Sequence, residues 1–161
     1  MEQEKIKSII SDILERMDIN HEPIEVRTDE TGRMMCFIVK TDDSGLLIGN
    51  GGGTLNAFNL ILKKIAAKNI HGDENYEEAT KFYVDINNYQ EKLLAELKTR
   101  AGIMAERARS FGVDVPLPPM SSYERMLIHT MFQGVGDLKT ESEGVGRERR
   151  IVIKYVGKTS A

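Results

Sequence analysis

The chain has 161 residues, of which 40% are hydrophobic and 29% charged, and its formal net charge is −3. This composition supports a packed core in one ordinary domain or two small ones, and it excludes a globally disordered chain. No run reaches the roughly 18 apolar residues of a membrane span, and the acidic first residues have no signal-peptide pattern, so we expect a cytoplasmic protein.

The first part of the chain predicts a helix followed by a β-hairpin. Apolar residues recur at helical spacing over residues 3–17. Residues 24–27 alternate between apolar and charged side chains, a turn follows, and residues 34–39 are apolar on both faces, which is typical of a central strand. That strand contains Cys36, the only cysteine, so an internal disulfide is excluded and we expect a buried thiol.

A second helix and a third strand follow. Residues 44–48 predict a helical turn, and residues 54–67 predict an amphipathic helix. The expected apolar side of this helix consists of Leu55, Phe58, Ile61, Leu62 and Ile65. Residues 72–80 are polar and acidic, as in a surface loop, and residues 82–86 alternate again, which predicts a strand.

The next segment predicts a long helix. Asn87 or Asn88 is the expected N-terminal cap, and the helix should end near Ser110, before Gly112. Its apolar positions are expected to be Leu93, Leu94, Leu97, Ile103 and Met104.

A short helix and a second hairpin complete the pattern. A Pro-Pro pair ends the alternating segment at residues 113–117, because no helix can cross it. Ser121 or Ser122 then caps a helix that runs to about residue 132. Residues 138–142 and 150–156 alternate and are joined by a segment with two glycines, which predicts a hairpin.

This order of elements predicts an α+β chain with two small domains joined by the long helix. The first domain is expected over residues 1–86 and the second over residues 87–161.

A glycine-rich segment, Gly49-Asn50-Gly51-Gly52-Gly53, opens the second helix. A Walker loop does not fit because Gly-Lys-Ser/Thr is missing, and a dinucleotide loop does not fit because Thr54 stands where the third glycine belongs. The Gly-x-x-Gly loop of a KH domain does fit, because two helices meet there at a bare backbone that a single strand of nucleic acid can approach. A flexible turn between two helices is the alternative.

The two central positions of this loop, Asn50 and Gly51, carry no charge. A phosphate clamp would then use backbone N–H groups at the start of the helix, together with Lys63 or Lys64. An apolar floor for bases is expected from residues 46–48 before the loop and from Leu55, Phe58 and Leu62 after it.

Arg125 and His129 are spaced to share one face of the short helix. Arginine can form a fork of hydrogen bonds with phosphate, and histidine can donate to phosphate or stack on a base. The side expected to pack inward consists of Tyr123, Leu127, Thr130 and Met131. The alternative is that Arg125 pairs with a carboxylate and His129 caps a carbonyl.

The surrounding sequence carries a family resemblance. The run from Pro119 to His129 continues through Thr140-Glu141-Ser142-Glu143-Gly144-Val145-Gly146 to Arg149-Arg150-Ile151-Val152-Ile153. This resembles the R-three-H domain of the bacterial Jag family, in which a KH domain comes directly before it, and the resemblance covers nearly the whole chain from about Ile24.

The resemblance implies a cytoplasmic regulator that binds single-stranded RNA or DNA and is linked to cell elongation, division or sporulation. It implies Arg125 and His129 as contact residues and a small KH protein as the partner in a heterodimer. A homodimer is the other expected assembly. The N-terminal Jag domain of many family members is expected to be missing here.

A basic hairpin lies beside the Arg/His helix, with cations at Arg147, Arg149, Arg150 and Lys154. Residues 1–86 carry 10 Lys/Arg against 16 Asp/Glu, whereas residues 87–161 carry 12 against 9. The second domain is therefore the better candidate for a phosphate-binding surface. The alternative for the hairpin is a solvated edge that charge keeps soluble.

An enzyme is not expected, and neither is a cofactor or a metal, because no group of His, Cys and Asp has metal-ligand spacing. The acidic cluster Asp73, Glu74, Glu77 and Glu78 is expected to be solvated. Two alternatives stay open. One is a nuclease that uses Arg125, His129 and Glu124, although Glu124 points about 100° away from Arg125. The other is a scaffold with little RNA affinity that dimerises through the KH-like domain.

Overall fold

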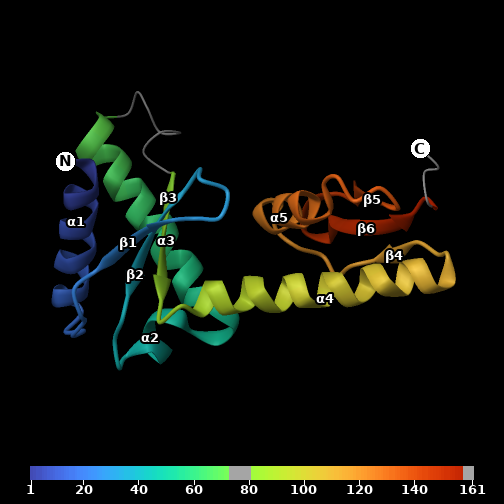
Figure 1. Cartoon of the computed structure of the whole chain (residues 1–161). Coiled ribbons are helices and arrows are strands. Elements are labelled where there is room, and N and C mark those ends of the chain that lie inside the picture. Colours follow the sequence, from blue (N-terminus) through green and yellow to red (C-terminus); the bar gives the residue numbers. More distant parts are fainter. Residues whose placement is uncertain (73–80, 158–161) are drawn as a thin grey trace. The chain divides into compact units, whose positions relative to one another are not determined.

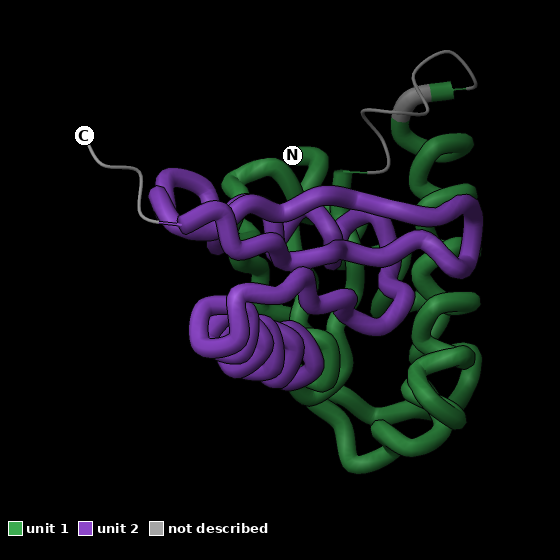
Figure 2. The backbone as a smooth tube through the Cα atoms, turned by 90° about the vertical axis from the view of Figure 1, so that its right-hand side faces the viewer, with its two compact units in different colours: residues 1–91 green, residues 92–161 purple. Residues whose placement is uncertain are grey.

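The computed structural model describes residues 1–72 and 81–157, which form two compact units over Met1–Glu91 and Lys92–Ala161 (Figure 2). Each unit has its own three-stranded sheet and its own hydrophobic core. The α+β class expected from the sequence is confirmed. The boundary between the two units falls within a helix rather than in a loop, because Glu91 and Lys92 both lie in α4, Tyr89–Phe111.

Unit 1 is a helix-covered sheet (Figure 1). Its elements in chain order are α1 (Glu2–Arg16), β1 (Glu25–Thr28), β2 (Met35–Val39), α2 (Ser44–Ile48), a 3-10 turn (Asn50–Gly52), α3 (Gly53–Ala66), a π-helical turn (Ala67–His71) and β3 (Phe82–Ile86). Strand β2 is central, as predicted, with β1 antiparallel on one side and β3 parallel on the other. Of the acidic segment 72–80 that was expected as a loop, residues 73–80 lie outside the described residues.

The core of unit 1 lies between the sheet and helices α1 and α3. The helices contribute apolar residues one or two turns apart, and the strands contribute alternate residues, as the periods of helix and strand require. Phe37 and Phe82 meet edge to face, with ring centroids 5.6 Å apart. The expectation that Ile61 belongs to this core is wrong, because its side chain is 54% exposed. The buried side of α3 lacks Ile61, which was predicted to belong to it, and includes the polar Asn59.

Asn59 joins α3 to the outer edge of the sheet. Its amide nitrogen donates to the carbonyls of Leu55 (3.1 Å) and Val84 (3.0 Å), and its oxygen accepts from the Val84 N–H (2.6 Å). Strand β3 is an edge strand, so its outward backbone groups have no neighbouring strand among the described residues. The side-chain amide therefore takes the place of a strand at Val84, which satisfies buried backbone groups.

The start of α4 is fixed by a residue that precedes the expected caps. The carboxylate of Asp85 accepts from the N–H groups of Gln90 (2.9 Å) and Glu91 (3.2 Å). Burial raises the pKa of Asp85, and these hydrogen bonds oppose that rise. The expectation of a cap at Asn87 or Asn88 is wrong, because the Asn88 side-chain oxygen has no hydrogen-bond partner among the described residues and that of Asn87 accepts from the Thr41 N–H instead.

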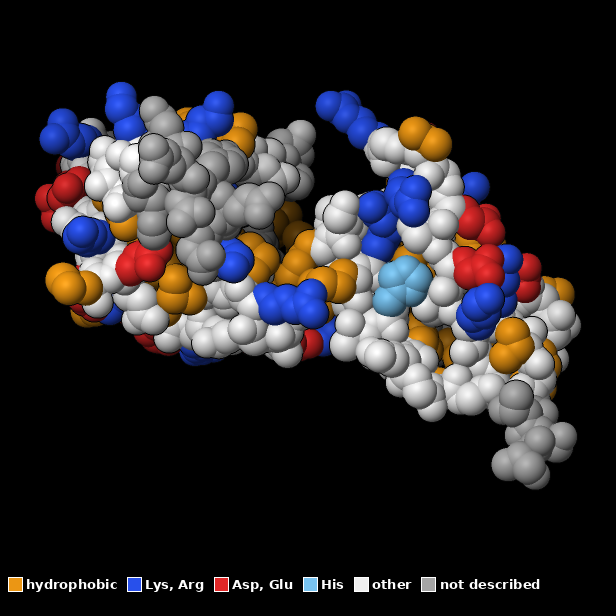
Figure 3. All heavy atoms as spheres, turned by 90° about the horizontal axis from the view of Figure 1, so that it is seen from above, with side chains coloured by type: hydrophobic (Ala, Val, Ile, Leu, Met, Phe, Trp, Pro, Cys, Tyr) orange, Lys and Arg blue, Asp and Glu red, His pale blue; other side chains and the backbone are white. Residues whose placement is uncertain are grey.

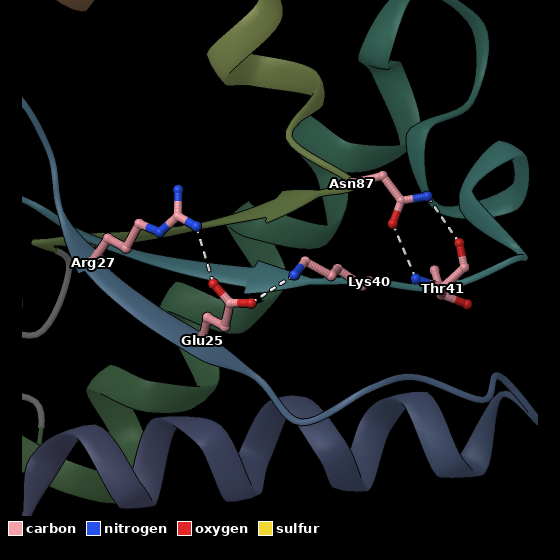
Figure 4. A network of polar contacts seen from close by, with 5 residues as sticks. All are labelled: Glu25, Arg27, Lys40, Thr41 and Asn87. Atoms are coloured by element: carbon pink, nitrogen blue, oxygen red, sulfur yellow. Dashed lines mark hydrogen bonds and ion pairs between the residues drawn. The ribbon is translucent and has the colours of Figure 1, made fainter.

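Asn87 has another structural role. Its side-chain oxygen accepts from the Thr41 N–H (3.0 Å) and its amide donates to the Thr41 carbonyl (2.8 Å), so it pairs with the chain just after β2 (Figure 4). On the same sheet, Glu25 binds Arg27 (3.0 Å) and Lys40 (2.6 Å). These two cations lower the pKa of Glu25, with Lys40 the larger influence.

Unit 2 contains most of α4, then β4 (Val115–Pro116), α5 (Ser122–Phe132), β5 (Leu138–Glu143), a 3-10 turn (Gly146–Glu148) and β6 (Arg150–Tyr155). The sheet order is β4-β6-β5, with both pairings antiparallel. The predicted hairpin is confirmed, and β4 adds a third strand at the edge. Arg109 near the end of α4 binds Asp137 just before β5 (2.6 Å) and also Glu106.

The buried stripe of α4 is made of small residues. Ala101, Ala105 and Ala108 enter the core of unit 2. Leu93 and Ile103, two of the larger apolar residues of this helix, are exposed. Small side chains at the contact let a helix lie close to its neighbours, so the larger residues remain at the flanks.

Candidate nucleic-acid interface

Helix α5 carries the Arg/His pair and begins as the sequence predicts. The Ser121 hydroxyl accepts from the Glu124 N–H (3.3 Å), and the Glu124 carboxylate accepts from the Ser121 N–H (2.7 Å). This reciprocal arrangement is a capping box, which satisfies the first N–H groups of the helix. Glu124 is thereby engaged at the helix start, which does not favour a role as a general base.

The buried side of α5 differs from the predicted one. Leu127 is buried as expected, but Thr130 and Met131 are exposed, and Ile128 and Phe132 are buried instead. The core stripe therefore lies beside the Arg125–His129 stripe rather than opposite it. This placement lets the Arg/His pair contact the sheet at the margin of the core.

Arg125 is held at the start of α5 by two hydrogen bonds. Its guanidinium donates to the Met120 carbonyl (2.7 Å) and to the Ser122 hydroxyl (2.9 Å). The Met120 N–H in turn donates to the Arg149 carbonyl (3.1 Å). A guanidinium has further N–H groups, so an oriented Arg125 can still donate to a ligand.

His129 is oriented by the sheet. Its Nδ1 atom lies 2.6 Å from the hydroxyl of Thr140 on β5. When Nδ1 accepts from that hydroxyl, Nε2 carries the ring proton and can donate to an anion. Thr140 is a site residue that the sequence interpretation missed; its position on the core-facing side of a predicted strand was the available signal.

These residues line one groove between α5 and β5, with a volume of about 630 Å³. Basic side chains line it from three elements: Arg125 and His129 from α5, Lys139 from β5, and Arg149 from the turn before β6. No carboxylate is among the residues of the described chain that line it. In Figure 3, a histidine on one face of the molecule is flanked by Lys or Arg side chains. The groove can therefore attract an anion and donate hydrogen bonds to it.

The structure does not bring the four cations of the basic hairpin together. Arg149 lines the α5–β5 groove, where it donates to the Ser142 hydroxyl (2.8 Å) and the Gly144 carbonyl (3.2 Å). Arg150 lines a different groove, and Arg147 is exposed on the 3-10 turn. Lys154 binds Glu141 (2.7 Å) and Glu143 (3.5 Å), with Asp114 4.0 Å away, so its charge is already balanced.

The Lys154 ion pair gives a pH prediction. Lys154, and to a smaller degree Lys139, lowers the pKa of Glu141 below 4.5. The ionised Glu141 thus stabilises the fold above its ordinary pKa, and this stabilisation is lost as the pH falls through the lowered value. We expect Lys154→Gln to raise the Glu141 midpoint toward 4.5 in a carbon-detected NMR titration. Lys139→Gln is the matched control and should raise it less; equal shifts would contradict the assignment.

The glycine loop of unit 1 is shaped by internal contacts. Gly49 has φ 71 and ψ −170, and a Cβ there would lie 2.1 Å from the Thr54 hydroxyl oxygen. Gly52 has φ 80 and is buried, and a Cβ there would lie 3.1 Å from the Tyr89 ring. Gly49 and Gly52 are therefore needed for the folded conformation of the loop, whereas Asn50 and Gly51 are exposed to solvent.

The contacts of Gly49 predict a loss of stability on substitution. Gly49→Ala should lower the free energy of unfolding of unit 1 by about 2 kcal/mol, because its backbone conformation is essentially restricted to glycine. Native-state hydrogen exchange of amides in β2 and β3 would measure this. Gly45→Ala is the matched control, because a Cβ at this helical position meets nothing within 4 Å. Equal stabilities for the two variants would contradict the prediction.

Lys63 and Lys64 lie far from the glycine loop along α3. They belong to its last turn, whereas the loop precedes its first residue, which separates them by about 15 Å along the helix axis. Burial also lowers the pKa of Lys63. The predicted apolar floor is likewise absent in its expected form, because Leu47, Leu55, Phe58 and Leu62 belong to the buried core. Leu46 alone of the expected set is largely exposed.

Two further properties bear on the class of site. Among residues 1–72 and 81–157, no group of His, Cys, Asp and Glu is arranged to hold a metal ion. Over the same residues, no helix combines the length and the apolar character of a membrane span.

Cys36 is buried as predicted, and burial raises its pKa to about 11, so its thiol stays protonated.

Comparison with known proteins places unit 2 in a domain class. Residues 95–155 match the model of the R-three-H domain. This range includes α4 from residue 95 onward, both edges of the sheet and the whole Arg125–His129 groove. The chain therefore contains an R-three-H domain; the match does not extend to the glycine loop.

Similarity to whole proteins extends over most of the chain. The chain is 28% identical to the RNA-binding protein KhpB of Clostridium symbiosum over 94% of its own length, and 31% identical to the protein of that name from Bacillus subtilis (strain 168) over 81%. Identity with the KhpB of Lactiplantibacillus plantarum is 34% over 80% of the chain. The resemblance to the Jag family is thereby confirmed. The chain spans 65%, 61% and 38% of these three relatives.

Proposed function

We propose that this protein binds single-stranded RNA through the α5–β5 groove and acts as an RNA-binding regulator rather than as an enzyme. The observation that carries the proposal is that Arg125, His129 and Arg149 line one groove without a carboxylate among its lining residues. Proteins named RNA-binding protein KhpB align over most of the chain, which supports RNA as the anion.

The chemistry of the groove suits a sugar-phosphate strand. Arg125 and Arg149 are each held by hydrogen bonds to neighbouring oxygen atoms, so little conformational entropy remains to be lost when they meet a phosphate. The imidazole of His129 can donate to a phosphate oxygen or stack on a base. Phe132 and Leu138 add apolar lining at the same groove. Of the other cations named from the sequence, Arg147 and Arg150 are proposed as flanking contacts, whereas the ion pairs of Lys154 favour a structural role.

Unit 1 is proposed to be the KH-like module, with residues 49–52 as a second contact for the strand. Helix α3 begins at the loop without a side-chain cap, so its first N–H groups point toward the position where a phosphate would lie. Because Lys63 and Lys64 belong to the other end of α3, we assign no contact with the same phosphate to them. The loop would then add weak, backbone-based binding.

Salt dependence tests the proposal directly. Log affinity for a fluorescent single-stranded RNA, measured by anisotropy, should fall with log salt with a slope of about −0.7 per phosphate contact, or roughly −2 to −3 for three or four contacts. The same titration with double-stranded RNA should show weaker binding. Absence of RNA binding at low salt, or a flat salt response, would contradict the proposal. Cleavage of the labelled RNA would instead support the nuclease alternative.

One observation favours the second candidate, a dimer or KH-mediated scaffold. Leu60 and Ile61 are adjacent on α3 and each is 54% exposed, so they form an apolar pair on the surface of unit 1. A homodimer, or a heterodimer with a small KH protein, would cover them. Sedimentation of the wild-type chain and of Ile61→Glu, with and without RNA, separates the two functions. A dimer that Ile61→Glu dissociates, in a protein that binds no RNA, would favour the scaffold.

A further inference from the structure

A second groove of unit 2 lies between α4 and the edge strand β4. Its volume is about 540 Å³, and its lining combines apolar residues such as Met104, Val113 and Pro116 with three arginines, Arg100, Arg107 and Arg150. The sheet order is β4-β6-β5, so this groove follows one edge of the sheet and the α5–β5 groove follows the other. The two grooves share no lining residue.

The three arginines are not used to hold the fold. The guanidinium groups of Arg100, Arg107 and Arg150 make no hydrogen bond or ion pair with any residue that the structure describes. Arg109 on the same helix shows the contrast, because it binds both Asp137 and Glu106. The single carboxylate among the lining residues, Asp114, lies 4.0 Å from the Lys154 ammonium. The α4–β4 groove therefore has three arginines against one carboxylate, which leaves it with an excess of positive charge.

Helix α4 places these cations in line with apolar side chains. Arg100, Met104, Arg107 and Phe111 follow one another at helical spacing and share one stripe. The stripe ends at Phe111, whose side chain is 72% exposed. Arg100 and Arg107 are about 10 Å apart along the helix axis. Phe111 does not line the groove itself but continues the same helix stripe. Cations spaced along a groove, with an accessible aromatic ring at the end of the stripe, match a ligand that carries both phosphates and flat bases.

We propose that the α4–β4 groove is a second contact surface for the same single-stranded nucleic acid, which crosses the turn between β5 and β6. Arg149 lines the first groove and Arg150 the second, and the exposed Arg147 lies on the turn itself. A nucleic-acid strand that contacts Arg149 in the first groove thus meets another cation, Arg150, at the next residue of the protein chain. The inference rests on the proposed function of the first groove, and it adds that the bound nucleic acid is long enough to reach the second.

The test compares short and long RNA. The double variant Arg100→Gln/Arg107→Gln should bind a single strand of about 15 nucleotides roughly 10-fold more weakly than the wild type, and a strand of about 5 nucleotides equally well. The magnitude of its salt slope for the long strand should fall by about 1.4, since two phosphate contacts are lost. Phe111→Ser should also weaken only the long strand. Lys5→Gln/Arg16→Gln removes the same charge from exposed positions of α1 and should change neither affinity.

The outcomes separate this inference from the proposed function. If the wild type binds both strands and the double variant retains full affinity for the long one, the α4–β4 groove holds no RNA and a protein partner becomes the better occupant. Equal losses for both strands would also overturn the inference, because the effect would then be one of general charge. If the wild type binds neither strand, the proposed function fails and this inference fails with it.

Discussion

Replacing Arg125 by alanine should weaken binding of single-stranded RNA about 50-fold, because charge-assisted hydrogen bonds to phosphate contribute about 1.5–3 kcal/mol each. The guanidinium is fixed by the Met120 carbonyl and the Ser122 hydroxyl, so the wild-type protein loses little entropy when it binds. Fluorescence anisotropy at constant salt measures the effect. Similar losses for all four homopolymers would indicate a phosphate contact, and loss for one base would indicate base readout.

The control for Arg125 keeps its charge. Arg125→Lys retains a cation but loses the planar fork, so we expect an affinity between those of the wild type and the alanine variant. Alanine also removes the two tethering hydrogen bonds, and a melting curve followed by circular dichroism checks that α5 remains folded. A folded Arg125→Ala protein with wild-type affinity would remove Arg125 from the site.

Replacing Asn59 by leucine should destabilise unit 1 by about 4 kcal/mol, since a buried donor or acceptor without a partner costs about 1–3 kcal/mol. The substitution leaves the N–H and the carbonyl of Val84 without the side-chain amide that now binds them at the sheet edge. A leucine of similar size fills the space but offers no polar atom. Native-state hydrogen exchange should show the loss at Val84 first and then across β3.

Asn56 provides the matched control for this substitution. It lies on the same helix but is exposed, so Asn56→Leu should change the free energy of unfolding by no more than about 0.5 kcal/mol. If Asn59→Leu is as stable as Asn56→Leu, water must satisfy the edge of β3 and the role assigned to the amide is wrong.

The order and type of the elements could be predicted because they depend on local patterns. Helical spacing indicated α1 and α3, alternation indicated β1, β5 and β6, and a run that is apolar on both faces indicated β2. The Ser121 cap was predictable for the same reason, since its partner Glu124 stands in the same turn.

The errors arise where a distant part of the chain decides the outcome. Asn59 is buried because it forms hydrogen bonds with the backbone of Val84, which lies 25 residues further along the chain. Helical periodicity alone would assign such a polar residue to the surface. The cap of α4 comes from Asp85 in the preceding strand rather than from the asparagines next to the helix. On α5, the buried face depends on where β5 lies, because Thr140 must reach His129.

The candidate site was predictable in its residue types but not in its grouping. The spacing of Arg125 and His129 indicated one face of a helix, and both line the same groove. The sequence could not show that Arg149 joins them while Arg150 lies elsewhere, because that depends on which side of β6 faces the core. Ile151 and Ile153 enter the core, and Arg150 therefore points away from it.

The adjacent positions 149 and 150 also offer a way to sort homologous sequences. They are neighbours in the gene, yet each side chain belongs to a different groove. A point mutation at one position can therefore alter one surface while the other is unchanged, so the two surfaces are free to diverge separately. Homologues with arginine only at position 149, or only at position 150, would form two classes whose RNA footprints differ in length.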